Sequence, residues 1–145
     1  MTREEFIDLL KDKGYSYEID GDRIIITHEG MVAILLSVPI PLNLKVEFRN
    51  DEHVDLNNAT ELPEDIVFNN TNDVFLGSLE NLPKGIKFQN TNDVFIGMNL
   101  EDLPSWLEFD NGNYVWLGNV NTYKWDCKIS GIRGAKIINL LIKNK

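Results

Sequence analysis

Apolar and polar positions along this chain repeat with a period of about twenty residues. The clearest pair is Leu62–Gly77, which reads LPEDIVFNNTNDVFLG, and Leu82–Gly97, which reads LPKGIKFQNTNDVFIG. A repeat of this length predicts a stack of similar coils, each of which buries its apolar edge against its neighbours. The pattern therefore specifies an architecture before it indicates any chemistry.

A single template describes the repeat: an apolar residue, any residue and an aromatic residue, followed by an Asn-rich gap and then Val-x-Leu. Sliding it along the chain in steps of about twenty residues gives about six matches. The matches are Ile26–Leu36, Val46–Leu56, Ile66–Leu76, Ile86–Ile96, Leu107–Leu117 and Cys127–Ile137. Each alternates apolar and other residues as half-buried strands do, and β-branched and aromatic residues favour the pleat. We therefore expect two short strands in each coil.

Residues at equivalent places in the coils form columns along the stack, and most of these columns are apolar. One reads His28, Phe48, Phe68, Phe88, Phe109 and Ile129, and another reads Ile34, Val54, Val74, Val94, Val115 and Ala135. Strands at one position in successive coils pair in parallel, at roughly 4.8 Å per coil. Since successive strand residues point to opposite faces, apolar columns predict the core and the columns between them predict the surface.

The segments between the two strands predict turns. Three of them, Asn69–Asp73, Gln89–Asp93 and Asp110–Asn113, are rich in residues that tolerate left-handed backbone angles and bond their own main chain. Leu-Pro pairs beginning at Leu62 and Leu82 mark the other corner of the coil, because proline cannot donate a hydrogen bond to a central ladder. Each coil is thus expected to have an Asn-rich turn on one side and a proline corner on the other.

The stretches VFLGSLENLP (Val74–Pro83) and VFIGMNLEDLP (Val94–Pro104) resemble the strand and corner of leucine-rich repeats, especially short bacterial forms with a Leu-Pro pair in each unit. The likeness covers roughly residues 26–137. Over this range the chain is similar to a group of small repeat proteins of bacteria and their phages, mostly of unknown function. The Ile-x-Phe segment predicts a second strand where that family commonly has a helix. The resemblance implies a solenoid with a binding role, and it transfers no functional residue.

The ends of a stack expose unpaired backbone groups and apolar columns, so they need capping segments. Thr2 and Glu5 have the spacing of a capping box, and an apolar stripe followed by Gly14 completes a predicted helix. The next segment predicts a hairpin around Asp20 and Gly21. We expect one mainly β domain over 1–145, with α+β character at the N-terminus. Its parts are a helix and hairpin cap over 1–25, a solenoid over 26–137 and a C-terminal cap over 138–145.

The composition agrees with one folded unit. The chain has 145 residues, of which 43% are hydrophobic, and this can supply the core of a single domain. Its one cysteine, Cys127, cannot form an internal disulfide and falls in an apolar column, which favours burial over reactivity. The longest apolar stretch, Met31–Leu44, is short and interrupted, so we expect no signal peptide or membrane span. A cytoplasmic protein is expected, in the host cytoplasm if a phage encodes it.

The charge balance argues against nucleic-acid binding. With 23 acidic and 14 basic residues the net charge is -9, whereas attraction to phosphate needs the opposite sign. Acidic residues gather beside the Leu-Pro corner and form a predicted acidic edge. Its members are Glu61, Glu64, Asp65, Glu80, Glu101 and Asp102. An acidic inhibitor of phage type that mimics DNA and blocks a host enzyme is therefore an alternative function, and an ordinary solvated edge is the simpler interpretation.

The middle position of the Val-x-Leu strand is the most informative surface column. It reads Leu35, Asp55, Phe75, Phe95, Trp116 and Lys136. If Val and Leu point inward, this column points outward, and its aromatic residues form an apolar strip of the kind that binds partners. We take Leu35, Asp55, Phe75, Phe95 and Trp116 as candidate partner-binding residues. A terminal segment that covers the strip, or stacking that merely stabilises the ladder, are the alternatives.

Neither catalysis nor a cofactor is indicated. The two histidines, His28 and His53, lie near no serine, cysteine or carboxylate set of recognisable spacing, and no phosphate, dinucleotide or metal motif occurs. Asp73, Asp93 and Asp110 recur with amide neighbours that suit calcium, but turn chemistry alone explains them. The chain is therefore expected not to be an enzyme.

Together these patterns predict a non-catalytic protein-binding repeat module without a cofactor. It would display a rigid aromatic ladder and an acidic edge to another protein, or to itself as a homodimer, and it would bind neither nucleic acid nor membrane directly. Two alternatives stay open. One is the acidic inhibitor or DNA mimic, and the other is a structural protein that associates with itself.

Overall fold

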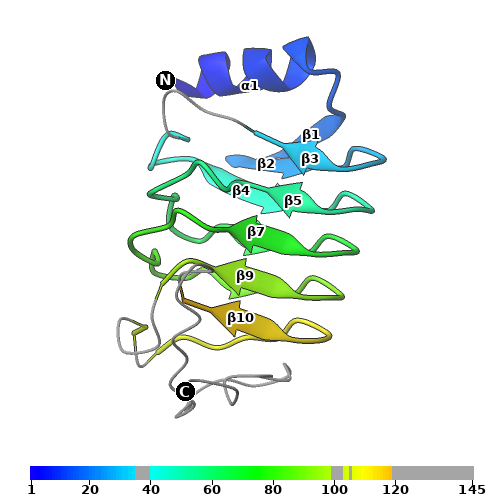
Figure 1. Cartoon of the computed structure of the whole chain (residues 1–145). Coiled ribbons are helices and arrows are strands. Elements are labelled where there is room, and N and C mark those ends of the chain that lie inside the picture. The colour runs from blue at the N-terminus through cyan, green and yellow to red at the C-terminus, as the bar shows by residue number, and fades with distance from the viewer. Residues whose placement is uncertain (35–39, 99–102, 105, 119–145) are drawn as a thin grey trace, which may run out of the picture.

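The computed structural model describes residues 1–34, 40–98, 103–104 and 106–118. The chain is a mainly β protein with one N-terminal helix and a parallel β-solenoid of about four turns (Figure 1). The predicted fold class is confirmed, and about four turns lie within the described residues, against the six coils predicted for the chain. The repeat expected over Cys127–Ile137 and the C-terminal cap expected over 138–145 lie outside the described residues.

Two five-stranded sheets run along the solenoid, and the coils supply their strands in turn. The first sheet consists of β1 (Tyr17–Asp20), β2 (Arg23–Ile26), β4 (Lys45–Phe48), β6 (Val67–Phe68) and β8 (Lys87–Phe88). The second consists of β3 (Val32–Ala33), β5 (Val54–Asp55), β7 (Val74–Leu76), β9 (Val94–Ile96) and β10 (Val115–Leu117). The β1 and β2 strands are antiparallel, whereas the other pairs described are parallel. The fifth coil joins the first sheet through a bridge between Phe88 and Phe109.

The helix α1 (Arg3–Asp12) covers the N-terminal end of the stack (Figure 1). Thr2 Oγ1 accepts a hydrogen bond from the Glu5 amide at 3.2 Å, and Glu5 Oε1 accepts one from the Thr2 amide at 2.7 Å, which confirms the predicted capping box. Phe6 and Leu10 are fully buried and belong to the core. Within the described part of the chain, no helix is long and apolar enough to cross a membrane.

The hydroxyl of Tyr15 forms hydrogen bonds with the N-terminal edge strand of the second sheet. It lies 3.1 Å from both the amide nitrogen and the carbonyl oxygen of Ala33 in β3, so that it can accept a hydrogen bond from the first and donate one to the second. One side chain thus occupies backbone groups that an edge strand would otherwise present to another chain. The antiparallel β1 covers the edge of β2 in the first sheet. The helix and the hairpin form the predicted N-terminal cap, and the hydrogen bonds of Tyr15 add to it.

The strand register of the first coil differs from the register in which the repeat template aligned this coil with the later ones. Ile24 pairs with Val46, and Ile26 pairs with Phe48, so the alignment that placed His28 in the phenylalanine column was wrong by two residues. His28 packs instead against the ring of Tyr15, with ring centroids 4.9 Å apart. The error arises because the first coil is longer than the others, and the apolar run Ile24–Ile26 fits the template in more than one register.

Four phenylalanine rings form the inner phenylalanine column of the solenoid: Phe48, Phe68, Phe88 and Phe109. Neighbouring ring centroids are 5.4, 5.5 and 5.0 Å apart, with interplanar angles of 4°, 8° and 24°. All four side chains are at most 1% exposed. Burying a phenylalanine side chain stabilises a fold by ~1.5 to 3 kcal/mol before entropy is subtracted, so this column is a main source of stability.

Buried asparagines hold the turn between the two strands of each coil: Asn50, Asn70, Asn90 and Asn111. Asn70 Nδ2, for example, donates to the carbonyl oxygens of Asn72, Asp73 and Glu52 at 3.0 to 3.2 Å. The predicted bonding of these turns to their own main chain is therefore confirmed. Left-handed backbone angles play no part in them, because among the described non-glycine residues only Asp65 has a positive φ, at 61°. The turns are shaped by side-chain hydrogen bonds instead.

Candidate functional site

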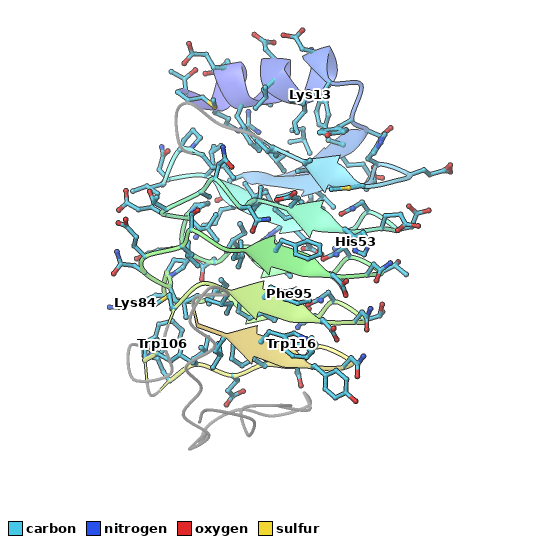
Figure 2. The ribbon with its side chains drawn as sticks, in the orientation of Figure 1. Lys13, His53, Lys84, Phe95, Trp106 and Trp116 are labelled. Atoms are coloured by element: carbon cyan, nitrogen blue, oxygen red, sulfur yellow. The ribbon has the colours of Figure 1, made fainter. Side chains whose placement is uncertain are left out.

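The aromatic ridge consists of Phe75, Phe95 and Trp116, which lie on the outward face of the second sheet. Figure 2 labels Phe95 and Trp116. The parallel register aligns them on β7, β9 and β10, as the sequence columns predicted. Ring centroids are 4.9 Å apart between the two phenylalanines and 6.0 Å apart between Phe95 and Trp116, at interplanar angles of 12° and 4°. All three side chains are half-buried, while the valine and leucine or isoleucine on either side of each are buried.

The local reason for the ridge is the alternation of each strand. Val74 and Leu76 point into the core, and this forces Phe75 between them to point outward. Identical strands in successive parallel coils place such side chains one above another, so each ring lies against the next. A stacked ring presents its edge to solvent, whereas its faces are covered by its neighbours. The ridge therefore offers a line of apolar ring edges and not a set of flat platforms.

Two further rings, which were not among the predicted ridge residues, extend the ridge. His53 meets Phe75 edge to face with centroids 5.6 Å apart, and Tyr114 meets Trp116 in the same manner at 6.2 Å. Both residues immediately precede the inward valine of their strands. The signal was present in the sequence, because this column reads His53, Asp73, Asp93 and Tyr114 and is aromatic only at its two ends.

Residues of the column His53, Asp73, Asp93 and Tyr114 form hydrogen bonds that link the ridge to the backbone of neighbouring coils. Asp93 Oδ1 accepts from the amide of Tyr114 at 3.0 Å, and Asp93 Oδ2 accepts from the indole Nε1 of Trp116 at 3.2 Å. Asp73 Oδ1 accepts from the amide of Asp93 at 3.0 Å, and His53 Nδ1 accepts from the amide of Asp73 at 3.2 Å. These aspartates therefore connect neighbouring coils.

This use of Asp73 and Asp93 bears on the calcium hypothesis. Each carboxylate accepts a hydrogen bond from a backbone amide of the next coil. In the residues described here, no group of three or more His, Cys, Asp or Glu side chains could hold a metal ion. The sequence had assigned both residues to local turn chemistry, whereas their carboxylates bond the backbone of the next coil.

The other predicted ridge residues lie at its N-terminal end. Asp55 pairs with Phe75 in the register of β5 and β7, is half-buried, and accepts a hydrogen bond from the Asn57 amide at 2.9 Å. Leu35 lies outside the described residues, and the register places Ala33 beside Asp55, where the alignment had placed Leu35. That assignment was wrong for the same reason as the His28 assignment. The ridge proper thus begins at Phe75.

The predicted acidic edge is interrupted by a lysine, Lys45. Glu61, Glu64 and Glu80 are exposed, and Asp65 forms an ion pair with Lys45, whose Nζ lies 2.6 Å from its Oδ2. The hydrogen bond from Lys45 lowers the pKa of Asp65, and the same bond raises the pKa of Lys45. The remaining predicted members, Glu101 and Asp102, lie outside the described residues. The described part of the edge therefore carries both signs of charge.

No model of a protein family, no curated protein and no solved structure matches the chain. The solenoid architecture that the leucine-rich-repeat resemblance implied is present.

Proposed function

We propose that this protein is a non-catalytic protein-binding module whose aromatic ridge docks a partner protein. The observation that carries the proposal is the rigid stack of Phe75, Phe95 and Trp116, which keeps apolar surface half-exposed on the outside of the solenoid. Aromatic side chains are enriched where interfaces concentrate their binding energy. A leucine-rich-repeat-like role in a bacterial or phage-infected cytoplasm is part of the same proposal.

A rigid ridge favours binding, because the entropy lost when side chains become ordered at an interface weakens association. The indole of Trp116 is already held by Asp93, and Phe95 is stacked on both of its faces. Immobilising a free side chain at an interface costs about 0.5 to 1.5 kcal/mol, and side chains ordered in advance avoid most of that cost. A partner would therefore meet a surface that needs little rearrangement.

We propose a different protein as the partner, in preference to a second copy of this chain. The net charge is -9, and Asp55 stands directly beside Phe75 at one end of the ridge. Two copies that met through this face would bring like charges together, which disfavours the homodimer. A partner with a neutral or basic surface around its apolar contact would not meet this repulsion.

The test compares the wild-type chain with Phe95→Asp and with the control Leu42→Asp, which places the same charge on another exposed apolar residue. Each tagged chain is used to capture proteins from a lysate of the organism that encodes this protein, and mass spectrometry identifies the proteins that are retained. We expect a partner held by the wild type and the control to be lost from Phe95→Asp, with affinity reduced by at least about thirtyfold. Circular dichroism should be the same for all three chains.

Four results would contradict the proposal. A partner that Phe95→Asp retains does not use the ridge, and unfolding of Phe95→Asp would show that the ridge serves stability. A doubled mass in solution that Phe95→Asp abolishes would replace the partner by a second copy. If a complex survives Phe95→Asp and dissociates at high salt, the acidic inhibitor is the better account, because screening weakens contacts between charges.

A further inference from the structure

The outward face of the second sheet has three columns of residues, and the aromatic ridge, with Asp55 at its N-terminal end, is the middle one. The column on the side of the Asn-rich turns reads His53, Asp73, Asp93 and Tyr114, and the column on the other side reads Asn57, Gly77, Gly97 and Gly118. In the described residues these columns contain aspartates but no lysine or arginine. The face is therefore acidic as well as aromatic, which favours a partner with basic side chains.

The outward face of the first sheet shows a different arrangement, because acids and bases are paired there. Glu47 is only 8% exposed, and it forms ion pairs with Arg23 and Arg49. Asp65 forms an ion pair with Lys45. A basic partner side chain that approached these carboxylates would have to compete with basic residues of the protein itself.

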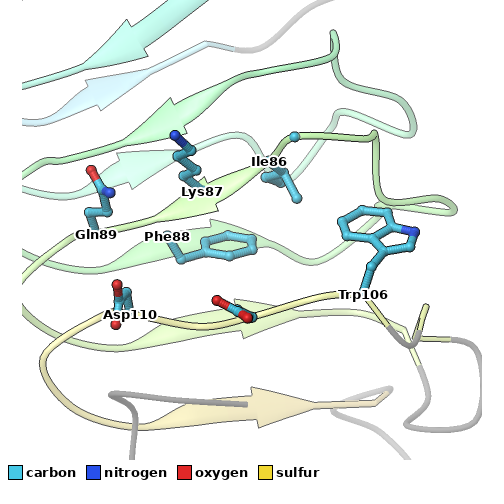
Figure 3. A pocket seen from close by; sticks show the side chains of 8 residues that line it. Ile86, Lys87, Phe88, Gln89, Trp106 and Asp110 are labelled. Atoms are coloured by element: carbon cyan, nitrogen blue, oxygen red, sulfur yellow. The ribbon is translucent and has the colours of Figure 1, made fainter. Parts of the chain in front are cut away.

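A cavity of about 250 Å³ lies on this same face beside Trp106, between the fourth and fifth coils (Figure 3). Its lining includes Lys87 and Glu108, and the bridge between Phe88 and Phe109 places these two residues side by side in register. Both signs of charge thus meet at the cavity, so it does not select a ligand by its charge. The face of the aromatic ridge is better suited to a charged partner.

The aspartates of the ridge face differ in what their carboxylates do. Asp73 Oδ1 and Asp93 Oδ1 each accept a hydrogen bond from a backbone amide of the next coil, so both residues have a structural task. Asp55 Oδ1 accepts from the amide of Asn57 in its own coil, and Asp55 forms no ion pair with any described residue. Asparagine can accept the same hydrogen bond, so the fold does not require the charge of Asp55.

The rings of the ridge determine where a cation can bind. An aromatic ring is negative over its face and positive at its edge. Phe95 is covered on both faces by its neighbours, and Phe75 stacks on Phe95, so the ridge presents ring edges that suit hydrocarbon better than charge. Asp55 lies directly beside Phe75 in the parallel register. A matching ligand has a charged head for this carboxylate and an apolar stem for the ring edges.

We propose that the ridge binds a lysine side chain that projects from an extended segment of the partner protein. Its ammonium group pairs with Asp55, and its four-carbon stem lies along the edge of Phe75, as lysine stems do on apolar surfaces. The stem covers about one coil spacing of ~4.8 Å, which brings the backbone of the segment to Phe95. Gly97 leaves room there because it has no side chain.

Lysine fits better than arginine because one oxygen of Asp55 is already bonded to the Asn57 amide. An ammonium group is a compact charge that one oxygen can hold, whereas the planar fork of a guanidinium group is matched to both oxygens of a carboxylate. This inference rests on the proposed function, since it names the chemistry of the partner that docks on the ridge.

The experiment titrates the isotope-labelled full chain with the peptide acetyl-Leu-Gly-Lys-Gly-Leu-amide at about 50 mM salt, where ion pairs are weakly screened. In the extended peptide both leucines lie on the same side as the lysine and can reach neighbouring rings. The matched peptide carries norleucine, which has the same stem and lacks the ammonium group. Nuclear magnetic resonance follows the backbone amides of Asp55, Phe75 and Phe95. We expect saturable shifts with a dissociation constant of about 1 mM for the lysine peptide.

The variant Asp55→Asn measures the ion pair, because it removes the charge and keeps the acceptor for Asn57. The ratio of the lysine-peptide affinity to the norleucine-peptide affinity should fall by about threefold in this variant, as expected for an exposed ion pair. Glu61→Gln, which removes an exposed acid elsewhere, should leave the ratio unchanged. Phe75→Ala should weaken both peptides to a similar extent, by about threefold, because the stem loses its apolar contact.

A ratio that is the same in the wild type and in Asp55→Asn would overturn the lysine assignment, and so would the absence of shifts at all three amides. An equal fall of the ratio in Glu61→Gln would also overturn it, because the attraction would then be general. If Asp55→Asn did not fold, Asp55→Ser would give the measurement, since its hydroxyl can also accept from the amide of Asn57.

The two proposals on this face fail in different ways. A partner protein that Phe95→Asp loses and Asp55→Asn binds at full strength would support docking on the ridge and overturn the lysine assignment. A partner protein that Phe95→Asp retains would overturn docking on the ridge, and the lysine assignment would fall with it.

Discussion

Two columns of stacked aromatic rings follow the solenoid, and they differ in the side of the strand from which they project. The inner phenylalanine column has ring spacings of 5.0 to 5.5 Å and is at most 1% exposed. The aromatic ridge has spacings of 4.9 and 6.0 Å and is half-buried. The coil repeat alone produces both stacks, so stacking does not by itself indicate either stability or recognition.

What separates the two columns is what surrounds the rings. Around Phe68 every direction is filled by core residues, whereas around Phe95 the stack and the strand cover part of the ring and water meets the rest. Removing an inner ring leaves a cavity, while removing an outer ring leaves space that solvent can enter. The inner column should therefore govern folding, and the ridge should remain available for binding.

The largest expected effect is the contrast between Phe68→Ala and the matched Phe95→Ala. Phe68→Ala should lower the free energy of unfolding by about 3 to 5 kcal/mol because it creates a core cavity. Phe95→Ala should lower it by about 1 kcal/mol, the typical value of lost ring stacking at a partly exposed site. Chemical denaturation followed by circular dichroism measures both values.

If Phe68→Ala does not fold, Phe68→Leu provides the measurement, since a smaller cavity costs less. Losses of equal size at Phe68 and Phe95 would break the comparison. The ridge would then belong to the folding core, and its role in docking would lose its main support.

An intermediate effect is expected at the turn that connects the two columns. Asn90 Nδ2 donates to the carbonyl oxygens of Asn72, Asn92 and Asp93 at 3.0 to 3.3 Å, and the side chain is buried. Asn90→Ala should destabilise the protein by about 1 to 3 kcal/mol, because buried carbonyl groups lose their donor. Thermal or chemical unfolding measures this loss.

The control for that variant is Asn92→Ala in the same turn. The amide of Asn92 donates to Asn72 Oδ1 at 3.0 Å from a half-buried position, where water can replace it. Its loss should cost less than about 1 kcal/mol. If Asn92→Ala were the more destabilising of the two variants, the half-buried side-chain amides, and not the buried ones, would hold neighbouring coils in register.

The smallest effect concerns the ion pair of Asp65 and Lys45. The pKa of Asp65 is lowered from its ordinary value of 3.8, so its contribution to stability is present above that value and is lost as the pH falls through the lower folded pKa. The pKa of Lys45 is raised above 10.5, so the lysine contribution disappears only as the pH rises through that raised value.

Asp65→Asn tests this pair without changing the backbone preference, because asparagine also tolerates the positive φ of 61°. The melting temperature of the variant should lie slightly below that of the wild type between about pH 5 and pH 9. The difference should shrink below pH 3.8 and vanish as the pH falls through the lowered pKa of Asp65 in the folded protein. A difference that stays constant into strong acid would show that the charge of Asp65 contributes nothing.

The sequence by itself determined the stack, its two strands per coil, the capped helix and the alignment of Phe75, Phe95 and Trp116. These features follow from alternation and from a repeat, both of which are local and are stated several times along the chain. Repetition makes such predictions robust, since an error in one coil is corrected by the others.

Only the tertiary structure decided the register of the first coil, the ion pair of Lys45 with Asp65, and the cavity beside Trp106. Each depends on which residues of neighbouring coils meet, and no local pattern specifies that. The places where one coil departs from the repeat are thus the places where packing, and not periodicity, sets the outcome.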